Sequence, residues 1–383
     1  MVFTSMCCKA FVTTYWVDSD GALSSLLTKI GSEDFVCIDT EFIPEKTYKP
    51  KLELIQIGIQ GDAYLVDFRE NELIGKKLLA ALSEMNHITV VFHSLIHDMK
   101  IIFNIIGNIP KNVFDSQIAA KFCGFRNPSY GHLVHDLMGV KLDKSMQRTN
   151  WSNRPLTDKE IEYASNDVTY LQEIYQILLS NLKENSNLEK YEDEINKYNY
   201  VDYYLPVDDT DLWKLMAGGL RERIELVRLK FLAAWREQRA KKKDIPSGSL
   251  IKNKDLKLIA KLGRDWESDR TLGRYKGLAF GINPSLEKAE NSPNNSWPNV
   301  PELPEKIDPQ IILVLRAVRD QISINSGIDA SVICPTSVLE NFDSENIPES
   351  LRTGWRSSLF TEHALNILNG NTSIKIEGSS ITF

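Results

Sequence analysis

The chain has 383 residues, more than one typical domain contains, which predicts two or three domains. Its 42% hydrophobic and 25% charged residues are ordinary for a globular protein and argue against disorder. The five cysteines are scattered and lack a CxxC spacing, which argues against a disulfide framework and a zinc site and fits a reducing compartment.

The sequence gives no sign of a membrane segment. No stretch approaches the roughly 20 apolar residues that a membrane-spanning helix needs. Residues 1–16 have neither a basic leader nor a long apolar run, so we do not interpret them as a signal peptide. We therefore expect a cytoplasmic protein without a membrane partner, and no feature predicts an obligate protein partner.

The first part of the chain alternates between strand-like and helix-like patterns. Strands are predicted at 35–39, 52–59, 63–68 and 88–93, and a turn at Gly61-Asp62 joins the second and third as a hairpin. Helices are predicted at about 72–82, 97–106, 115–123 and 157–180. This order predicts an α/β domain with a mixed sheet and helices on both of its faces.

The remainder of the chain has helical patterns. A long helix is predicted from about Asp209 to Lys241, and another begins near Lys252. Prolines and asparagines then predict a linker at 291–308. A further helical unit follows from Pro309, with a last helix near 361–369 and either a small hairpin or a loose tail around Gly378.

The charge is distributed unevenly along the chain. The formal net charge is −7, but residues 211–276 hold 18 Lys+Arg against 9 Asp+Glu, a local charge of +9. The other residues therefore carry −7 − 9 = −16. A basic segment joined to an acidic remainder favours a nucleic-acid partner that the total charge alone would argue against.

Several acids follow predicted strands or lie on predicted helices. Asp39 and Glu41 are two apart after an apolar strand, so they share one face and would repel each other unless a cation lies between them. Oxygen ligands without a His or Cys cluster suit Mg²⁺ or Mn²⁺. Taken alone, however, this pair is better explained by solvated acids at a strand end.

Asp98 follows the strand at 88–93, near a helix start, and Asp167 lies on a helix with Tyr163 four residues before it on the same face. Asp98 alone could be an ordinary first-turn acid that the helix dipole stabilises. Tyr163 and Asp167 alone could be a buried hydrogen-bonded pair. An acid beside an apolar helix stripe needs a partner, and a metal shared with Asp39 and Glu41 would supply one.

The order and context of these residues resemble a known family. FVCIDTEF (35–42), HSLIHD (93–98) and YASNDVTYL (163–171) resemble the three exonuclease motifs of the DEDDy subgroup, in which Tyr163 takes the tyrosine position. LDKSMQRTNWSNRPL (142–156) is similar to the signature of the ribonuclease D family, with Met146 where that family often has an acid.

The resemblance implies a ribonuclease H-like exonuclease domain at 1–205 that binds two divalent cations, Mg²⁺ or Mn²⁺. Asp39 would bridge both cations, Glu41 and Asp167 would complete the first site, and Asp98 would act on the second through water. Tyr163 would position the attacking water. The implied activity is 3′–5′ hydrolysis of RNA to nucleoside 5′-monophosphates, on tRNA precursors and other structured RNA 3′ ends.

The helical part resembles the HRDC nucleic-acid-binding domain, with one copy at 206–290 and a second, divergent copy at 309–383. The basic side chains of the first copy are candidates for contact with RNA phosphates, although individual residues could equally form a solvated helix face with ion pairs. The candidate RNA-binding residues are Phe42, His93, Arg221, Arg223, Arg228, Arg236, Arg239 and Lys241. Phe42 could instead be buried.

Two alternatives remain open from the sequence. A 3′–5′ DNA exonuclease would use the same carboxylates, although the 142–156 string and the helical modules favour RNA. A non-catalytic RNA-binding protein on a nuclease fold is the other alternative, and the presence of all five catalytic residue types argues against it.

Overall fold

The computed structural model describes residues 12–43, 47–143, 145–147, 149–300, 308–342, 347–378 and 380–383. By their contacts the residues divide into two compact units. Unit 1 comprises Met1–Glu41, Glu53–Tyr203 and Pro304–Phe383, and unit 2 comprises Phe42–Leu52 and Tyr204–Leu303.

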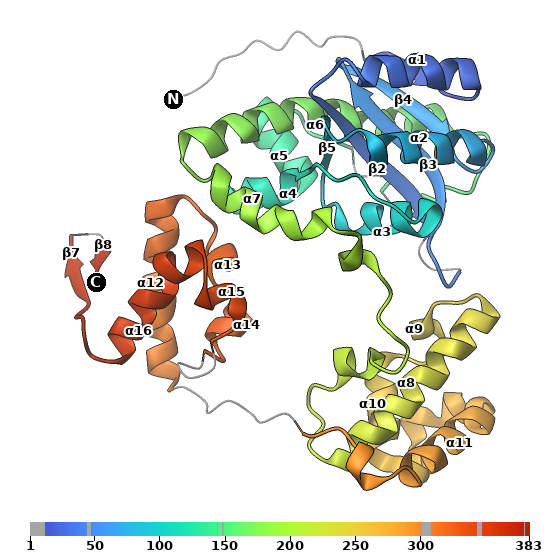
Figure 1. The fold of residues 1–383 in the computed structure, drawn as a ribbon, viewed down its shortest axis with the longest axis vertical. Helices are drawn as coiled ribbons and strands as arrows, with labels where there is room; N and C mark the ends of the chain where they lie inside the picture. Colours follow the sequence, from blue (N-terminus) through green and yellow to red (C-terminus); the bar gives the residue numbers. More distant parts are fainter. Residues whose placement is uncertain are drawn as a thin grey trace. The chain divides into compact units, whose positions relative to one another are not determined.

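A six-stranded mixed sheet forms the centre of unit 1 (Figure 1), in the order β1-β4-β3-β2-β5-β6. β3 and β4 form the predicted antiparallel hairpin, while β1 with β4, β2 with β5 and β5 with β6 pair in parallel. The strands are β1 (Thr14–Trp16), β2 (Phe35–Ile43), β3 (Lys51–Ile59), β4 (Asp62–Asp67), β5 (Thr89–Phe92) and β6 (Val113–Asp115). The predicted mixed sheet is confirmed, but β1 and β6 were not predicted, because three residues are too few to show an alternating pattern.

Helices cover both faces of this sheet. A Cβ on Gly58 of β3 would lie 2.4 Å from the Val168 carbonyl oxygen of α6, so α6 approaches this face at backbone distance. Ile55 points to the opposite face, where its side chain lies near Gly75 of α2. The helices are α1 (Asp20–Ile30), α2 (Glu72–Glu84), α3 (Ile96–Ile106), α4 (Ser116–Phe122), α5 (Tyr130–Met138), α6 (Asp158–Glu184) and α7 (Leu188–Asn196), followed by η1 (Lys197–Asn199) and η2 (Val201–Tyr204).

Unit 2 is helical and has a hydrophobic core of its own, with Trp266 fully buried at its centre. The single helix predicted from Asp209 to Lys241 is wrong, because Gly218-Gly219 interrupts it and Gly219 has a positive φ of 88°. The elements are η3 (Leu212–Met216), α8 (Arg223–Lys243), α9 (Ser247–Leu250), α10 (Asn253–Leu262), η4 (Gly263–Ser268), η5 (Arg270–Leu278), α11 (Ala279–Glu290) and η6 (Asn294–Ser296).

The C-terminal helices belong to unit 1 and pack on α4 and α7. The Asp329 amide donates to the Lys121 carbonyl oxygen (2.8 Å), Asn187 donates to the Ser326 carbonyl oxygen (3.0 Å), and Arg356 pairs with Glu194 (2.6 Å). Of the two possibilities for the C-terminus, the hairpin around Gly378 is confirmed. The elements are α12 (Pro309–Ser326), α13 (Ala330–Ile333), α14 (Thr336–Leu339), α15 (Glu349–Arg352), η7 (Ser357–Thr361), α16 (Glu362–Leu368), β7 (Lys375–Glu377) and β8 (Ser380–Thr382).

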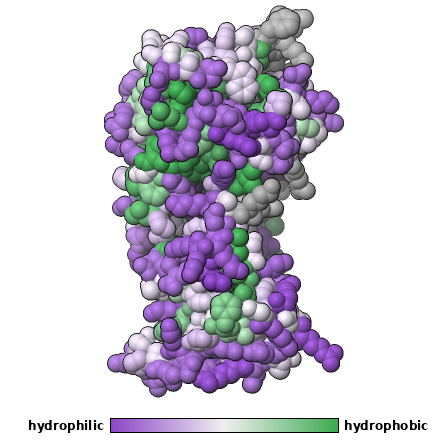
Figure 2. Space-filling view, turned by 90° about the vertical axis from the view of Figure 1, so that its right-hand side faces the viewer, coloured by the Kyte–Doolittle hydropathy of each residue, from purple (hydrophilic) through white to green (hydrophobic). Residues whose placement is uncertain are grey.

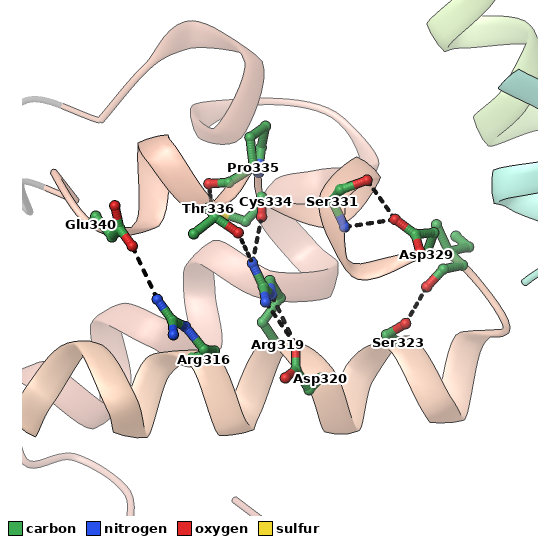
Figure 3. Close-up of polar contacts among 11 residues, drawn as sticks. Arg316, Arg319, Asp320, Ser323, Asp329, Ser331, Cys334, Pro335, Thr336 and Glu340 are labelled. Atoms are coloured by element: carbon green, nitrogen blue, oxygen red, sulfur yellow. Dashed lines mark hydrogen bonds and ion pairs between the residues drawn. The ribbon is translucent and has the colours of Figure 1, made fainter. Parts of the chain in front are cut away.

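The two helical modules repeat one structural motif. In α12 the buried Arg319 donates to the Cys334 carbonyl oxygen and to Thr336, which lie 15 and 17 residues further along (Figure 3). In α8 the buried Arg236 donates to the Ile251 carbonyl oxygen and to Asn253, again 15 and 17 residues further along. The copies are thus offset by 83 residues (319 − 236) over this part, and α9 and α13 match at the same offset. The repeat gives corresponding positions that can be compared directly.

Hydrophilic side chains predominate on the face drawn in Figure 2, where hydrophobic side chains gather in small patches between them. In the part of the chain that the structure describes, none of the helices has both the length and the apolar character needed to cross a membrane.

The close approach of α6 to β3 yields a first prediction. Gly58→Ala would drive a methyl group against the Val168 carbonyl, so we expect the free energy of unfolding to fall by about 1–3 kcal/mol in urea denaturation. Gly21→Ala on α1 is the matched control, because its Cβ meets nothing within 4 Å, and it should be neutral or slightly stabilising. Equal stability of Gly58→Ala and wild type would contradict the close packing.

Candidate active site

Strand β2 brings two acids to one face of the sheet. Val36, Cys37 and Ile38 are buried and fix the strand between β3 and β5. Asp39 and Glu41 follow, and because they are two residues apart both side chains project from the same face. Both are half-buried, so neither carboxylate is fully hydrated.

Helix α6 supplies the third acid. It begins with a capping box in which Thr157 and Glu160 satisfy each other's backbone amides, and Gly58 lets its middle turns approach the sheet. Carboxylate oxygens of Asp39, Glu41 and Asp167 consequently lie within 4.8 Å of one another. Residues more than 120 positions apart in the chain therefore share one small space. The sequence-based expectation that these acids converge agrees with this geometry.

Asp98 approaches the same space but is held differently. It is buried in the first turn of α3, and the Thr40 hydroxyl donates a hydrogen bond to its carboxylate. Asp115 fixes the start of this helix by accepting from the Leu95 amide (2.7 Å). Asp98 is not one of the three acids whose oxygens lie within 4.8 Å of one another.

Burial and mutual repulsion raise the pKa values of these acids. Burial, followed by the charge of Asp167, raises the pKa of Asp39 well above its usual range. Burial and then the charge of Asp39 raise the pKa of Glu41 to about 10. Burial raises the pKa of Asp98 as well, with the charge of Asp39 as the next cause. A cation with a preference for oxygen ligands would relieve both causes, because it offsets the lost hydration and the mutual repulsion.

Asp167 and Tyr163 form a pair on α6. Burial raises the pKa of Asp167 to about 7, and a hydrogen bond from the Tyr163 hydroxyl acts in the opposite direction. Burial, together with the charge of Asp167, raises the pKa of Tyr163. The phenol therefore keeps its proton near neutral pH and is suited to donating hydrogen bonds.

A partly buried ion pair holds the packing partner of Tyr163 in place. The Trp151 ring is buried beside Tyr163, with ring centroids 6.1 Å apart. Arg154 donates to the Trp151 carbonyl oxygen (2.7 Å) and binds both carboxylate oxygens of Asp67 at the end of β4. This bidentate pair joins the 149–156 segment to the end of β4.

The structure adds residues that had no assigned role from the sequence. Besides Thr40 and Trp151, the buried Tyr130 lies close enough to the acids for Asp167 and Asp39 to raise its pKa, although burial is the larger cause. Its hydroxyl donates to the Asn166 carbonyl oxygen (2.7 Å). Nothing in its sequence context marks Tyr130, whereas Thr40 lies within the Asp-Thr-Glu motif.

His93 and Phe42 both lie on or next to the strands of the site. His93 Nδ1 is 2.8 Å from the Ser116 hydroxyl, its ring contacts Tyr130 edge-on, and burial lowers its pKa to about 4. Phe42 directly follows Glu41 in β2 and is half-buried. Neither makes a contact that assigns it to substrate. Lys144 and Arg148 of the signature string lie outside the described residues.

Most of the basic residues predicted to bind RNA have partners within unit 2. Arg236 is buried in the repeated motif, Arg228 pairs with Glu290 (2.7 Å), and Lys241 pairs with Asp209 (2.7 Å). Arg223 donates to backbone carbonyl oxygens of the 294–298 segment. Arg221 and Arg239 have no side-chain hydrogen bond or ion pair to any described residue.

Comparison with known proteins agrees with this site. A family model described as 3′–5′ exonuclease matches residues 14–183. The chain is 30% identical over 374 residues to the ribonuclease D of Jannaschia sp., covering 94% of this chain and 96% of that protein. The chain belongs to the ribonuclease D family. It is therefore a hydrolase of the 3′–5′ exoribonuclease type.

Two further relatives extend the comparison over the whole chain. The ribonuclease D of Bartonella henselae is 30% identical over 381 residues, and the match covers 94% of this chain and 91% of that relative. The crystal structure of Escherichia coli RNase D, described as an exoribonuclease involved in structured RNA processing, has a TM-score of 0.76 and 27% identity. That match covers 94% of this chain and 100% of the other.

The raised pKa of Asp167 yields a second prediction. The folded protein holds this proton up to about pH 7, whereas the unfolded chain releases it near pH 3.8, so stability falls as pH rises through this window. In metal-free protein, Asp167→Asn should therefore gain stability over wild type between pH 4 and 7, by about 1–3 kcal/mol in urea unfolding. Glu173→Gln, exposed on the same helix, should follow the wild-type profile. If the stability of Asp167→Asn varied with pH in parallel with that of wild type, the raised pKa of Asp167 would be refuted.

Proposed function

We propose that the chain releases nucleoside 5′-monophosphates one at a time from the 3′ end of RNA, with two divalent cations, Mg²⁺ or Mn²⁺, held by its carboxylates. The convergence of Asp39, Glu41 and Asp167 is the observation that supports this proposal most strongly. Asp39 would be the ligand shared by the two cations, Glu41 and Asp167 would complete one site, and Asp98 would contribute to the other through water. The donors are all carboxylate oxygens, which fits these hard cations.

Bound divalent cations would supply Lewis acidity and a water of lowered pKa for attack on phosphorus. The protein residues supply orientation. Tyr163 keeps its proton and donates to Asp167, so it orients the attacking water rather than acting as a base. Thr40 holds Asp98 in place by donating a hydrogen bond to its carboxylate. This division of roles is part of the proposal.

A cavity beside the acids offers a place for the terminal nucleotide. Its volume is about 280 Å³, and its wall includes Tyr163 and Asp167 of α6 together with residues 140–143 and Met146. Lys141 and Lys159 also line it. The wall also carries the acids Asp143, Glu162 and Asp167. We propose that the 3′-terminal nucleotide binds here with its phosphate at the lysines.

We further propose that the substrate is structured RNA such as a tRNA precursor, and that 206–290 and 309–383 are HRDC-like modules. The basic charge of 211–276 supports an RNA-binding role for the first module. The repeated buried-arginine motif supports a common origin for the two. The relative from Escherichia coli, described as acting in structured RNA processing, makes tRNA with a 3′ extension the first substrate to test.

Metal dependence and the acids give a third prediction. Purified protein should shorten a 5′-labelled, 3′-extended tRNA stepwise with Mg²⁺ or Mn²⁺ and not with EDTA, as followed on a sequencing gel. Asp39→Ala and Asp167→Ala should each lower the rate by about a hundredfold or more, because each removes a charged ligand. Glu173→Gln is the control for loss of an acid elsewhere on α6.

Shortening that persists in EDTA would reject the mechanism. A DNA oligonucleotide of matched sequence, digested in parallel, distinguishes the alternative substrate class. Faster cleavage of the DNA would overturn the proposed preference for RNA while leaving the metal site in place.

Tyr163→Phe is the fourth prediction. Loss of the hydroxyl removes the group that orients water but no charged ligand, so kcat should fall by about tenfold to a hundredfold. Mn²⁺ affinity, measured by calorimetry, should stay within a few-fold of wild type. A loss of Mn²⁺ binding comparable to that of Asp167→Ala would show that the tyrosine acts by holding the metal site together instead.

A further inference from the structure

An exposed aromatic ring in unit 2 has no role in the proposals above. Phe280 is the second residue of α11 and is 60% exposed, although the next residues, Gly281 and Ile282, are buried. Isolated exposed apolar side chains are common and need no explanation by themselves. Phe280 differs because a charged side chain lies against it.

The guanidinium of Arg239 lies over the Phe280 ring, with its central carbon 5.2 Å from the ring centroid. Its Nε is shielded from solvent without a hydrogen-bond partner, and among the described residues no acid pairs with it. By contrast, Arg228 and Arg236 on the same helix are engaged inside the fold. Arg239 therefore retains an unneutralised positive charge beside an aromatic face.

The pair stands on a rigid support. Trp235, one turn before Arg239 on α8, packs directly on Gly281, where an added Cβ would lie 2.2 Å from the indole ring. The Trp235 side chain of α8 thus contacts the α11 backbone directly, next to Phe280. Two regular helices rather than a loop hold the ring and the guanidinium, so the surface is preorganised for a ligand.

Exposed basic residues lie near the pair along the chain. Lys242 and Lys243 lie one turn after Arg239 on α8 and are exposed. Lys276, in η5 just before α11, is exposed as well. None of these lysines has a side-chain hydrogen bond or ion pair to another described residue, whereas the neighbouring Lys241 pairs with Asp209. The surroundings favour a polyanion over an apolar protein partner.

The repeat shows that this surface is not required by the motif. At the offset of 83 residues, Arg239, Lys242 and Lys243 correspond to Ile322, Asn325 and Ser326 of α12. There Ile322 is buried, and the Ser326 carbonyl oxygen accepts a hydrogen bond from Asn187. The second copy uses this helix end to pack on the exonuclease domain, while the first keeps it charged and exposed.

We propose that Arg239 and Phe280 form a stacking platform for an unpaired RNA base, with Lys242, Lys243 and Lys276 neutralising the adjacent phosphates. This inference rests on the proposed function, since it takes RNA as the substrate. The open face of the ring accepts any base, because every base has a π-face, so the platform binds single strands without reading their sequence.

The test measures binding of a fluorescent single-stranded RNA by anisotropy, in full-length protein carrying Asp39→Asn to prevent cleavage. Phe280→Ala should weaken binding about tenfold, Phe280→Leu should weaken it similarly, and Phe280→Trp should restore it. Leu215→Ala is the control, because Leu215 is 73% exposed in the same unit and should leave binding unchanged. Replacing Lys242 and Lys243 with Gln should reduce the salt dependence of binding, whereas Phe280→Ala should not.

Two results would overturn the platform. If Phe280→Ala bound RNA with wild-type affinity, the ring would not contact RNA and would be available for a protein partner instead. If Phe280→Leu bound with wild-type affinity, the contact would be apolar and would not involve stacking. Thermal unfolding of each variant checks the fold, and an exposed ring should leave the melting temperature unchanged. Cleavage of RNA by the protein with Asp39 intact is measured separately, so failure of the platform is distinguishable from failure of the proposed function.

Discussion

Like charges that share a poorly hydrated space are the constraint on which the catalytic domain depends. The four acids at the centre, Asp39, Glu41, Asp98 and Asp167, each lose hydration by burial. The charge of another acid in this group also raises the pKa of Asp39, Glu41 and Asp98. Left alone, such a group favours expansion of the site or protonation of its acids. The surrounding fold must therefore resist expansion at the points where these side chains are attached.

The anchors of the site can be understood in this way. Gly58 lets α6 approach the sheet at backbone distance, so Asp167 cannot move away without unpacking a helix. Asp115 fixes the start of α3 through the Leu95 amide, which holds Asp98 in its first turn. The Arg154–Asp67 pair holds Trp151 against Tyr163. Each anchor is an interaction among neutral or oppositely charged groups that opposes the repulsion at the centre.

The sequence predicted what local patterns encode. The period of two on β2 predicted that Asp39 and Glu41 share a face, and the spacing of four on α6 predicted the Tyr163–Asp167 pair. The hydrogen bond from Thr40 to Asp98 could not be predicted, because it joins two elements whose separation depends on the whole sheet. Likewise, the short strands β1 and β6 are strands because their neighbours offer free edges, which no window of three residues records.

The count of charges described the composition of the basic segment but did not show which of its residues are exposed. The excess of nine positive charges correctly describes the composition of 211–276, but a count does not distinguish Arg236, inside the module, from Arg239 on its surface. The two differ by three positions on one helix, so the hydrophobic pattern places them on neighbouring faces rather than opposite ones. Only the acceptors at 15 and 17 residues further along, which recur in the second module, identify the buried one.

The comparison of the two modules therefore separates scaffold from surface within a single chain. Arg236 and Arg319 recur because each closes a helical module by satisfying carbonyl oxygens that would otherwise be buried without partners. The positions one turn beyond them are free to diverge, since neither module needs them for its core. One copy has used that freedom to attach to the exonuclease domain and the other to present positive charge. The two modules thus differ in the use of this helix end: the second copy adds packing area to the catalytic domain, and the first keeps an exposed basic surface of the kind that the proposed RNA contact needs.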